Sequence, residues 1–278
     1  MKINKYLSLV LAITLLVSCE KNKIEYNTTD IADKAEFQLH YYVPVTAVAA
    51  NNITKVEING QLFANNKAPL TTYNAIPNGA VGRFYAVDPG TVNIKMYTGT
   101  DMATLVYDQN TTLTAGKQNV FVHDFIQVPV VFSNDYPYTP NATGVTDSTA
   151  WVKFYNFLYE TSGAPSGKKL QYQYIDSRTS LPVNIGQPVS FGETTGWQKV
   201  TVVKSVNISS GSRLITFKMK EVDINGVIGD LQIRGTSGSY AAYSATATLF
   251  IGRRYHHTMA GFRAVASPNS SVRIFTAL

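Results

Sequence analysis

The sequence predicts an all-β fold. Short stretches of alternating apolar and polar residues recur along the chain, and turn residues such as Asn-Gly and Pro-Gly separate them. The composition agrees, because 17 tyrosines and 13 phenylalanines occur in a background of Thr, Ser, Asn and Gly. No long stretch has the 3.6-residue apolar period of an amphipathic helix. With about seven strands in each half, the pattern predicts two tandem β-sandwich domains, immunoglobulin-like or transthyretin-like.

The first element is an apolar segment that predicts a signal peptide over residues 1–18. Lys2 and Lys5 precede a nearly uncharged apolar run over residues 6–17. A basic start followed by a run of this kind is typical of secretory signal peptides. The run is too short to span a bilayer.

The only cysteine, Cys19, closes this segment in the order Leu16, Val17, Ser18, Cys19. These four residues resemble the lipobox of bacterial lipoproteins, in which the cysteine becomes residue one and carries acyl chains such as palmitate. The resemblance implies that Cys19 is lipidated and that a membrane is a partner of the chain, since several acyl chains anchor firmly. A free or buried thiol after a signal peptide is the alternative.

The residues after the cysteine bear on location. Glu20 is not the aspartate associated with inner-membrane retention, so the resemblance implies the outer membrane. Residues 20–23 read Glu-Lys-Asn-Lys, which is not the acidic cluster often used for surface export. The periplasmic face and the cell surface therefore both stay open.

A flexible tether and a first domain follow. Residues 19–35 lack apolar periodicity and predict a lipidated tether. Residues 36–132 predict the first sandwich domain, in which Asn59 and Gly60 form a hairpin turn. We expect its strands at 37–43, 55–58, 61–63, 92–96, 105–107, 111–113 and 119–125.

A linker separates this domain from a second one. Residues 133–150 are polar and punctuated by proline, and predict a linker. Residues 151–278 predict the second sandwich domain. We expect its strands at 151–159, 170–175, 200–206, 214–221, 231–234, 245–251, 255–262 and 272–276.

The expected strands of the two halves match in order. Strands 37–43, 55–58 and 92–96 correspond to strands 151–159, 170–174 and 215–219. This order predicts a duplicated β-domain, with chance similarity between two unrelated sandwiches as the alternative.

The same strand edges carry a family resemblance. It rests on Val56 to Gln61, Tyr73, Pro89 to Val92, and Leu113, Thr114, Ala115, Gly116 and Lys117. These residues resemble an exported domain of unknown function, number 4397, which is common in Bacteroidota lipoproteins. The resemblance covers residues 35–125 well and residues 151–262 loosely. Because that family has no established chemistry, it implies a fold and a location rather than a reaction.

Charge and motifs indicate no reaction and no cofactor. The formal charge of +6 becomes +4 once Lys2 and Lys5 leave with the signal, and the basic residues are scattered, which argues against nucleic acid. His40, His123, His256 and His257 do not have metal-site spacing, and we interpret them as strand-surface residues. No G-x-S-x-G motif occurs.

Carboxylates and exposed rings are the remaining candidates. Six acidic residues could serve a glycosidase pair but cannot be paired from sequence: Glu160, Asp176, Glu193, Glu221, Asp223 and Asp230. The pair Asn225 and Gly226 fits a β-turn better than a calcium loop. Trp197, in a glycine-flanked loop at 192–197, is the candidate for stacking on a ligand. Four tyrosines are further candidates for stacking on a ligand: Tyr136, Tyr138, Tyr240 and Tyr243. In the alternative interpretation these rings cover domain edges or an interdomain seam.

These observations predict a non-catalytic, lipid-anchored binding or adhesion module of the outer membrane. Its ligand is a glycan or an envelope protein, and Trp197 is the candidate contact. A fimbrillin-like pilus subunit is the first alternative, although residues 20–35 contain no arginine for the usual processing. An envelope glycan hydrolase is the second alternative.

Overall fold

The computed structural model describes residues 31–65, 67–77, 83–135, 149–202, 211–223, 225–226, 228–268 and 270–277. The predicted signal peptide, Cys19 and most of the tether lie outside these residues, as do residues 136–148 of the predicted linker. Ile31–Leu278 forms one compact unit. Within the described residues the fold is all-β, and the one helical element is a 3₁₀ turn, Ala49–Asn51. No helix of this part is long and apolar enough to cross a membrane.

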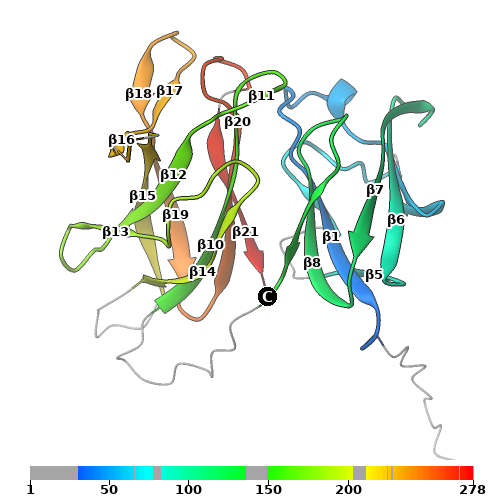
Figure 1. Cartoon of the computed structure of the whole chain (residues 1–278), viewed down its shortest axis with the longest axis horizontal. Coiled ribbons are helices and arrows are strands. Elements are labelled where there is room, and N and C mark those ends of the chain that lie inside the picture. Colours follow the sequence, from blue (N-terminus) through cyan, green and yellow to red (C-terminus); the bar gives the residue numbers. More distant parts are fainter. Residues whose placement is uncertain are drawn as a thin grey trace, which may run out of the picture. The chain divides into compact units, whose positions relative to one another are not determined.

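The first half of the chain forms two sheets. The β1 sheet has the order β4-β1-β8-β9, with β5 also pairing with β1, and the β2 sheet has the order β3-β2-β6-β7. Their strands are β1 (Ala35–Tyr41), β2 (Lys55–Ile58), β3 (Gln61–Ala64), β4 (Ala75–Ile76), β5 (Tyr85–Val87), β6 (Gly90–Thr98), β7 (Thr104–Leu113), β8 (Gly116–Val122) and β9 (Val130–Ser133). Figure 1 shows β1 and β8 side by side, and the two strands are parallel.

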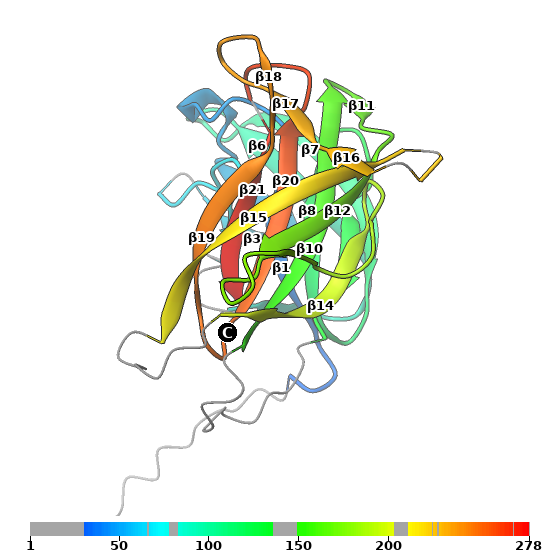
Figure 2. The same cartoon turned by 90° about the vertical axis from the view of Figure 1, so that its left-hand side faces the viewer.

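The second half forms two further sheets and a separate hairpin. The β10 sheet has the order β11-β10-β20-β21 with β14 on β10, and the β12 sheet has the order β13-β12-β15-β16 with β19 on β15. In Figure 2, β12, β15 and β19 of the second sheet are seen in front. The strands are β10 (Thr149–Thr161), β11 (Ala164–Pro165), β12 (Lys169–Ile175), β13 (Pro182–Asn184), β14 (Thr194–Thr201), β15 (Ser212–Val222), β16 (Ile228–Asp230), β17 (Gln232–Arg234), β18 (Tyr240–Ala242), β19 (Ser244–Phe250), β20 (Arg254–Phe262) and β21 (Ser271–Ala277).

The strand pairing of the first half recurs in the second. The first strand of each half pairs in parallel with a late strand, β1 with β8 and β10 with β20, and a final strand closes each sheet antiparallel. In the other sheet of each half, β2 pairs with β6 and β12 pairs with β15. This recurrent pairing agrees with the strand order matched in the sequence, because β1, β2 and β6 again correspond to β10, β12 and β15.

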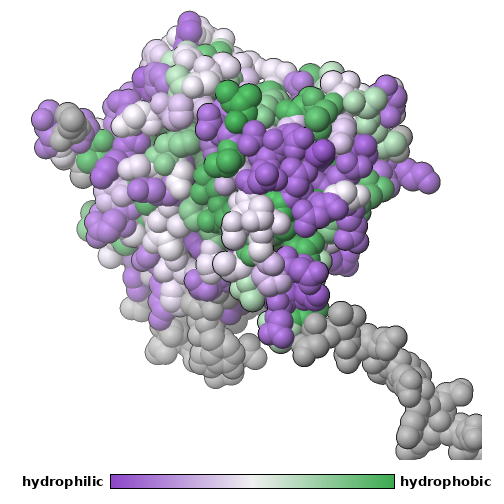
Figure 3. All heavy atoms as spheres, turned by 45° about the vertical axis from the view of Figure 1, so that its right-hand side comes forward, coloured by the Kyte–Doolittle hydropathy of each residue, from purple (hydrophilic) through white to green (hydrophobic). Residues whose placement is uncertain are grey.

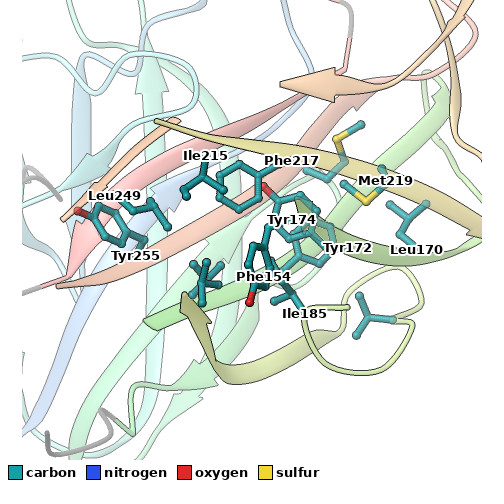
Figure 4. Packing of buried hydrophobic residues seen from close by; sticks show 14 of the residues in the cluster. Phe154, Leu170, Tyr172, Tyr174, Ile185, Ile215, Phe217, Met219, Leu249 and Tyr255 are labelled. Atoms are coloured by element: carbon teal, nitrogen blue, oxygen red, sulfur yellow. The ribbon is translucent and has the colours of Figure 1, made fainter. Parts of the chain in front are cut away.

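Each half has its own hydrophobic core. Alternate residues of β1, β2, β6 and β8 meet in one buried cluster, which includes Phe37, Val56, Ile94 and Val120. The second cluster gathers side chains from β10, β12, β15 and β20 (Figure 4), where the rings of Phe154 and Phe217 lie on either side of Tyr172 at centroid distances of 4.5 and 5.3 Å. Alternation along each strand therefore places one face in a core, as a two-layered arrangement requires.

The other faces of β1, β8, β10 and β20 meet in a third buried cluster, here called the aromatic seam. Its buried members are Tyr42, Phe121, Tyr155, Phe157 and Ala260. Phe121 lies 4.9 Å from Tyr155 and 5.1 Å from Phe157, ring centroid to centroid. The outward faces of the β1 sheet and the β10 sheet are therefore covered by the other half of the chain.

Several strand expectations need correction. Residues 105–107 and 111–113 belong to one strand, β7, because its polar middle residues pair with β6 along its length. Trp197 lies in β14 rather than in a loop, since β14 begins at Thr194 and ends at Thr201. The hairpin at Asn59 and Gly60 is confirmed, with φ of 51° and 78° as a tight two-residue turn requires. The turn at Asn225 and Gly226 is confirmed as well, because the Gly226 amide donates to the Asp223 carbonyl.

Candidate binding groove

A groove opens along one edge of the first half. It lies between β3, an edge strand of the β2 sheet, and the short strands β4 and β5 at the edge of the β1 sheet. Its volume of about 520 Å³ lies in the range of small-ligand pockets. The lining residues are Phe63, Ala64, Asn65, Ala68, Pro69, Leu70, Thr71, Asn74, Ala75, Ile76, Pro77, Arg83 and Tyr85.

The groove arises because the edge of the β1 sheet is interrupted. Opposite Leu39 and His40 the edge partner is β4, and opposite residues 35–37 it is β5. Gln38 falls between the two, and its Nε2 donates a hydrogen bond of 2.7 Å to the carbonyl of Arg83. This buried side chain replaces a missing backbone partner and fixes the chain where it re-enters the sheet.

The aromatic side of the groove is rigid. Tyr85 and Phe63 meet edge to face with centroids 4.8 Å apart, and the Tyr85 hydroxyl donates to the Phe63 carbonyl at 3.1 Å. Phe63 also packs 5.7 Å from Phe37 of the core. Burial raises the pKa of the Tyr85 hydroxyl above its ordinary value. Both rings are half-buried and present fixed surfaces to the groove.

The polar side carries amides, a hydroxyl and a cation. Asn74 Nδ2 donates to Thr71 Oγ1 at 2.5 Å, and Asn65 Oδ1 accepts from the Lys67 amide at 3.0 Å. Each amide group has a second polar atom, and neither of these atoms has a hydrogen-bond partner in the described part of the chain. Arg83 is exposed and is the only charged residue in the described part of the lining. The groove can therefore hydrogen-bond hydroxyl or carboxylate groups beside an aromatic surface.

The structure places Trp197 elsewhere. Its half-buried ring meets His256 edge-on, with centroids 4.9 Å apart, and Lys153 Nζ lies 6.0 Å from the ring centroid. Lys153 itself donates to the Ser133 carbonyl at 2.7 Å, and burial lowers its pKa to about 8. Trp197 thus lies beside the aromatic seam and not beside the groove. Of the tyrosines named with it, Tyr240 is exposed, the Tyr243 hydroxyl accepts from the Val272 amide, and Tyr136 and Tyr138 lie outside the described residues.

The interpretation of the histidines as strand-surface residues is wrong. All four are buried, three of them where the two halves cover each other's outward faces and His257 inside the second core. In the seam the His256 ring stacks on Phe275 at 4.5 Å and the His40 ring packs tilted against it at 4.7 Å, centroid to centroid. His123 Nδ1 bonds the Tyr159 hydroxyl at 2.8 Å. His257 points into the second core, where its Nδ1 bonds the Tyr172 hydroxyl at 2.8 Å. His256 and His257 thus lie on opposite faces of β20, as expected for neighbours on a strand.

The acidic candidates are engaged by nearby basic side chains or backbone amides. Four of them form salt bridges: Glu160 with Arg263, Asp176 with Arg178, Glu221 with Lys168 and Asp230 with Lys220. Glu193 accepts a hydrogen bond from the Ser190 amide. No group of three or more metal-ligating side chains occurs among the residues described. Cys19 lies outside them.

Comparisons with known proteins identify no family for this chain. No family model matches the chain, and no curated protein matches it. Among solved structures, a leucine-rich repeat protein from Bacteroides thetaiotaomicron VPI-5482 is similar at 11% identity with a TM-score of 0.22. The match covers 84% of this chain and 26% of that one, so the chain spans about a quarter of its length. A likeness at this level carries no argument about fold or function.

Proposed function

We propose that the chain is a non-catalytic lipoprotein of the outer membrane that acts as a binding or adhesion module. Its lipid anchor is Cys19, and its ligand site is the groove between β3, β4 and β5. The observation that carries the ligand site is the geometry of the groove, where two fixed rings face amide, hydroxyl and guanidinium groups. Sites for small ligands commonly combine an apolar surface with a few polar groups in this way.

The proposal includes the finer architecture of two β-sandwich domains, at residues 36–132 and 151–278. Its support is the pairing pattern that recurs in the two halves, together with a separate core in each. The parallel pairing of the first strand with a late one suits an immunoglobulin-like or transthyretin-like arrangement. Membership of the family of the domain of unknown function 4397 is part of the proposal and rests on the sequence resemblance.

The anchor is supported by the sequence alone. The order Leu16, Val17, Ser18, Cys19 follows a short apolar run, and the chain contains no other cysteine. On the face seen in Figure 3, hydrophilic residues cover much of the surface and hydrophobic ones form small groups between them. Such a surface suits a folded body that works in water while a lipid holds it at the membrane.

A glycan array is the direct test of the ligand site. The probe is the unlipidated mature chain, residues 20–278, compared with Asn74→Ala and with Tyr97→Ala as a matched control. Tyr97 is a half-buried tyrosine on β6 that does not line the groove. We expect selective binding that is weakened by Asn74→Ala and unchanged by Tyr97→Ala. Absence of binding to any glycan, and to envelope proteins in a parallel pull-down, would contradict the proposal.

The alternative of a pilus subunit is distinguished by intact mass. A tethered module keeps the acylated Cys19, whereas a processed subunit loses it. The hydrolase alternative gains no support from the acidic residues, because four of the six candidates are held in salt bridges.

A further inference from the structure

We infer that the groove binds a glycan that carries a carboxylate, with Arg83 as the partner of that group. The inference rests on the proposed function, since it names the ligand class of the same site. It follows from the charge of the lining, the position of Arg83 and the interrupted strand edge.

The charge on the described lining is positive. Arg83 is the one charged residue among the described residues that line the groove. An anionic ligand would therefore meet an attractive charge from this part of the lining.

Arg83 has no partner of its own in the described part of the chain. Elsewhere seven basic residues form salt bridges: Lys34, Lys55, Lys95, Lys168, Arg178, Lys220 and Arg263. Arg83 forms neither a salt bridge nor a side-chain hydrogen bond there. Its backbone is nevertheless fixed by Gln38, which is 2% exposed. The exposed guanidinium presents two parallel N–H donors, which match the two oxygens of a carboxylate.

The strand edge favours a sugar over an extended peptide. A peptide that added to this edge would need a continuous row of backbone N–H and C=O groups. Each strand that borders the groove is short: β3 has four residues with a register shift in its pairing, β4 has two and β5 has three, and Pro77 directly after β4 has no N–H. Recognition must therefore come from side chains. Paired amide groups and half-buried rings suit the hydroxyls and the apolar ring face of a sugar.

The test compares acidic and neutral sugars of the same size by titration calorimetry. One pair is trigalacturonic acid with its methyl ester, and the other is sialyllactose with its methyl ester, so that the source of the carboxylate is distinguished. The protein is residues 20–278, as wild type, as Arg83→Gln and as Arg213→Gln. Arg213 is the matched control, because it is exposed, lies on β15 and does not line the groove.

We expect an acidic sugar to bind about ten- to a hundredfold more tightly than its neutral partner, as for a charge-assisted hydrogen bond. Arg83→Gln should remove the preference for the acidic sugar and leave the affinity for the neutral sugar unchanged. Arg213→Gln should change neither the preference nor the affinity. Thermal melting confirms that each variant is folded. Equal binding of both sugars, or an unchanged preference in Arg83→Gln, would overturn the ligand class and leave the proposed binding function standing. Binding of acidic peptides but of no sugar would overturn the glycan inference, and no binding of any kind would overturn both.

Discussion

Acidification should weaken the fold through His40. This side chain is 0% exposed, its Nε2 lies 3.0 Å from Asn119 Oδ1, and its ring stacks 4.4 Å from Phe121. The other ionisable groups at the seam are His256, Lys153 and Arg273, and the pKa of His256 is lowered by burial and by the charges of His40 and Lys153. Burial lowers the pKa of His40 from 6.5 to about 4. The folded protein therefore keeps this ring neutral.

The lowered pKa of His40 sets the size of the loss of folding stability on acidification. The unfolded chain takes up a proton at His40 near pH 6.5, and the folded chain does so only near pH 4. Between pH 7.5 and pH 5.0 the free energy of unfolding should thus fall by about 2 kcal/mol for this one group. His257, whose pKa is lowered by burial to about 3, adds a similar loss. Together they amount to about 4 kcal/mol, against about 5–15 kcal/mol for a typical folded domain.

The assay is urea unfolding followed by tryptophan fluorescence at pH 7.5 and 5.0. His40→Gln is the variant, because glutamine can still bond Asn119 and does not titrate. We expect the loss of stability between the two pH values to be about 2 kcal/mol smaller in His40→Gln than in the wild type. The same loss in both proteins would refute the reasoning, because His40 would then be protonated in the folded state or exposed to solvent.

Three further outcomes are expected. Phe121→Ala should lower the free energy of unfolding by about 3–5 kcal/mol, because it empties the centre of the aromatic seam; a loss below 1 kcal/mol in chemical denaturation would show that the seam is not packed as described. Gly60→Ala should lower the free energy of unfolding by about 1–2 kcal/mol, because φ at this residue is 78°. An added Cβ meets no atom within 4 Å, so the loss comes from the backbone conformation and not from a clash. An unchanged melting temperature would contradict this. Cys19→Ala should abolish incorporation of labelled palmitate and release the protein from the membrane fraction, whereas labelling that persists in the variant would exclude Cys19 as the anchor.

Alternation made much of the fold predictable. Val56 and Ile58 alternate with Lys55 and Glu57. This pattern predicts the first and last residues of β2 correctly, and the Asn-Gly pair after it predicts the hairpin to β3. The matched strand order anticipated the recurrent pairing. The polar middle of β7 hides its continuity, because Asp108 and Asn110 are typical of turns, although an exposed edge strand tolerates them.

The burial of the histidines was missed because alternation marks a strand with two faces and says nothing about what covers the outer one. A signal was nevertheless present in β10. From Trp151 to Tyr159 almost every residue is apolar or aromatic, and such runs occur in strands buried on both faces.

The groove could not be predicted from local pattern. Its residues come from the end of β3, from residues 65–77 and from the start of β5, and no motif links them. Only the pairing of β4 and β5 with β1 brings Arg83 and Tyr85 opposite Phe63. The Pro- and Asn-rich character of residues 65–78 was the sole hint.

Hydrogen exchange in the presence of a glycan that binds the mature chain tests the central claim, that the groove is the ligand site. The account predicts that protection increases in β3, in residues 67–77 and in β5, while β14 with Trp197 stays unchanged. Protection confined to β14 would place the ligand on Trp197 and contradict the groove as the site.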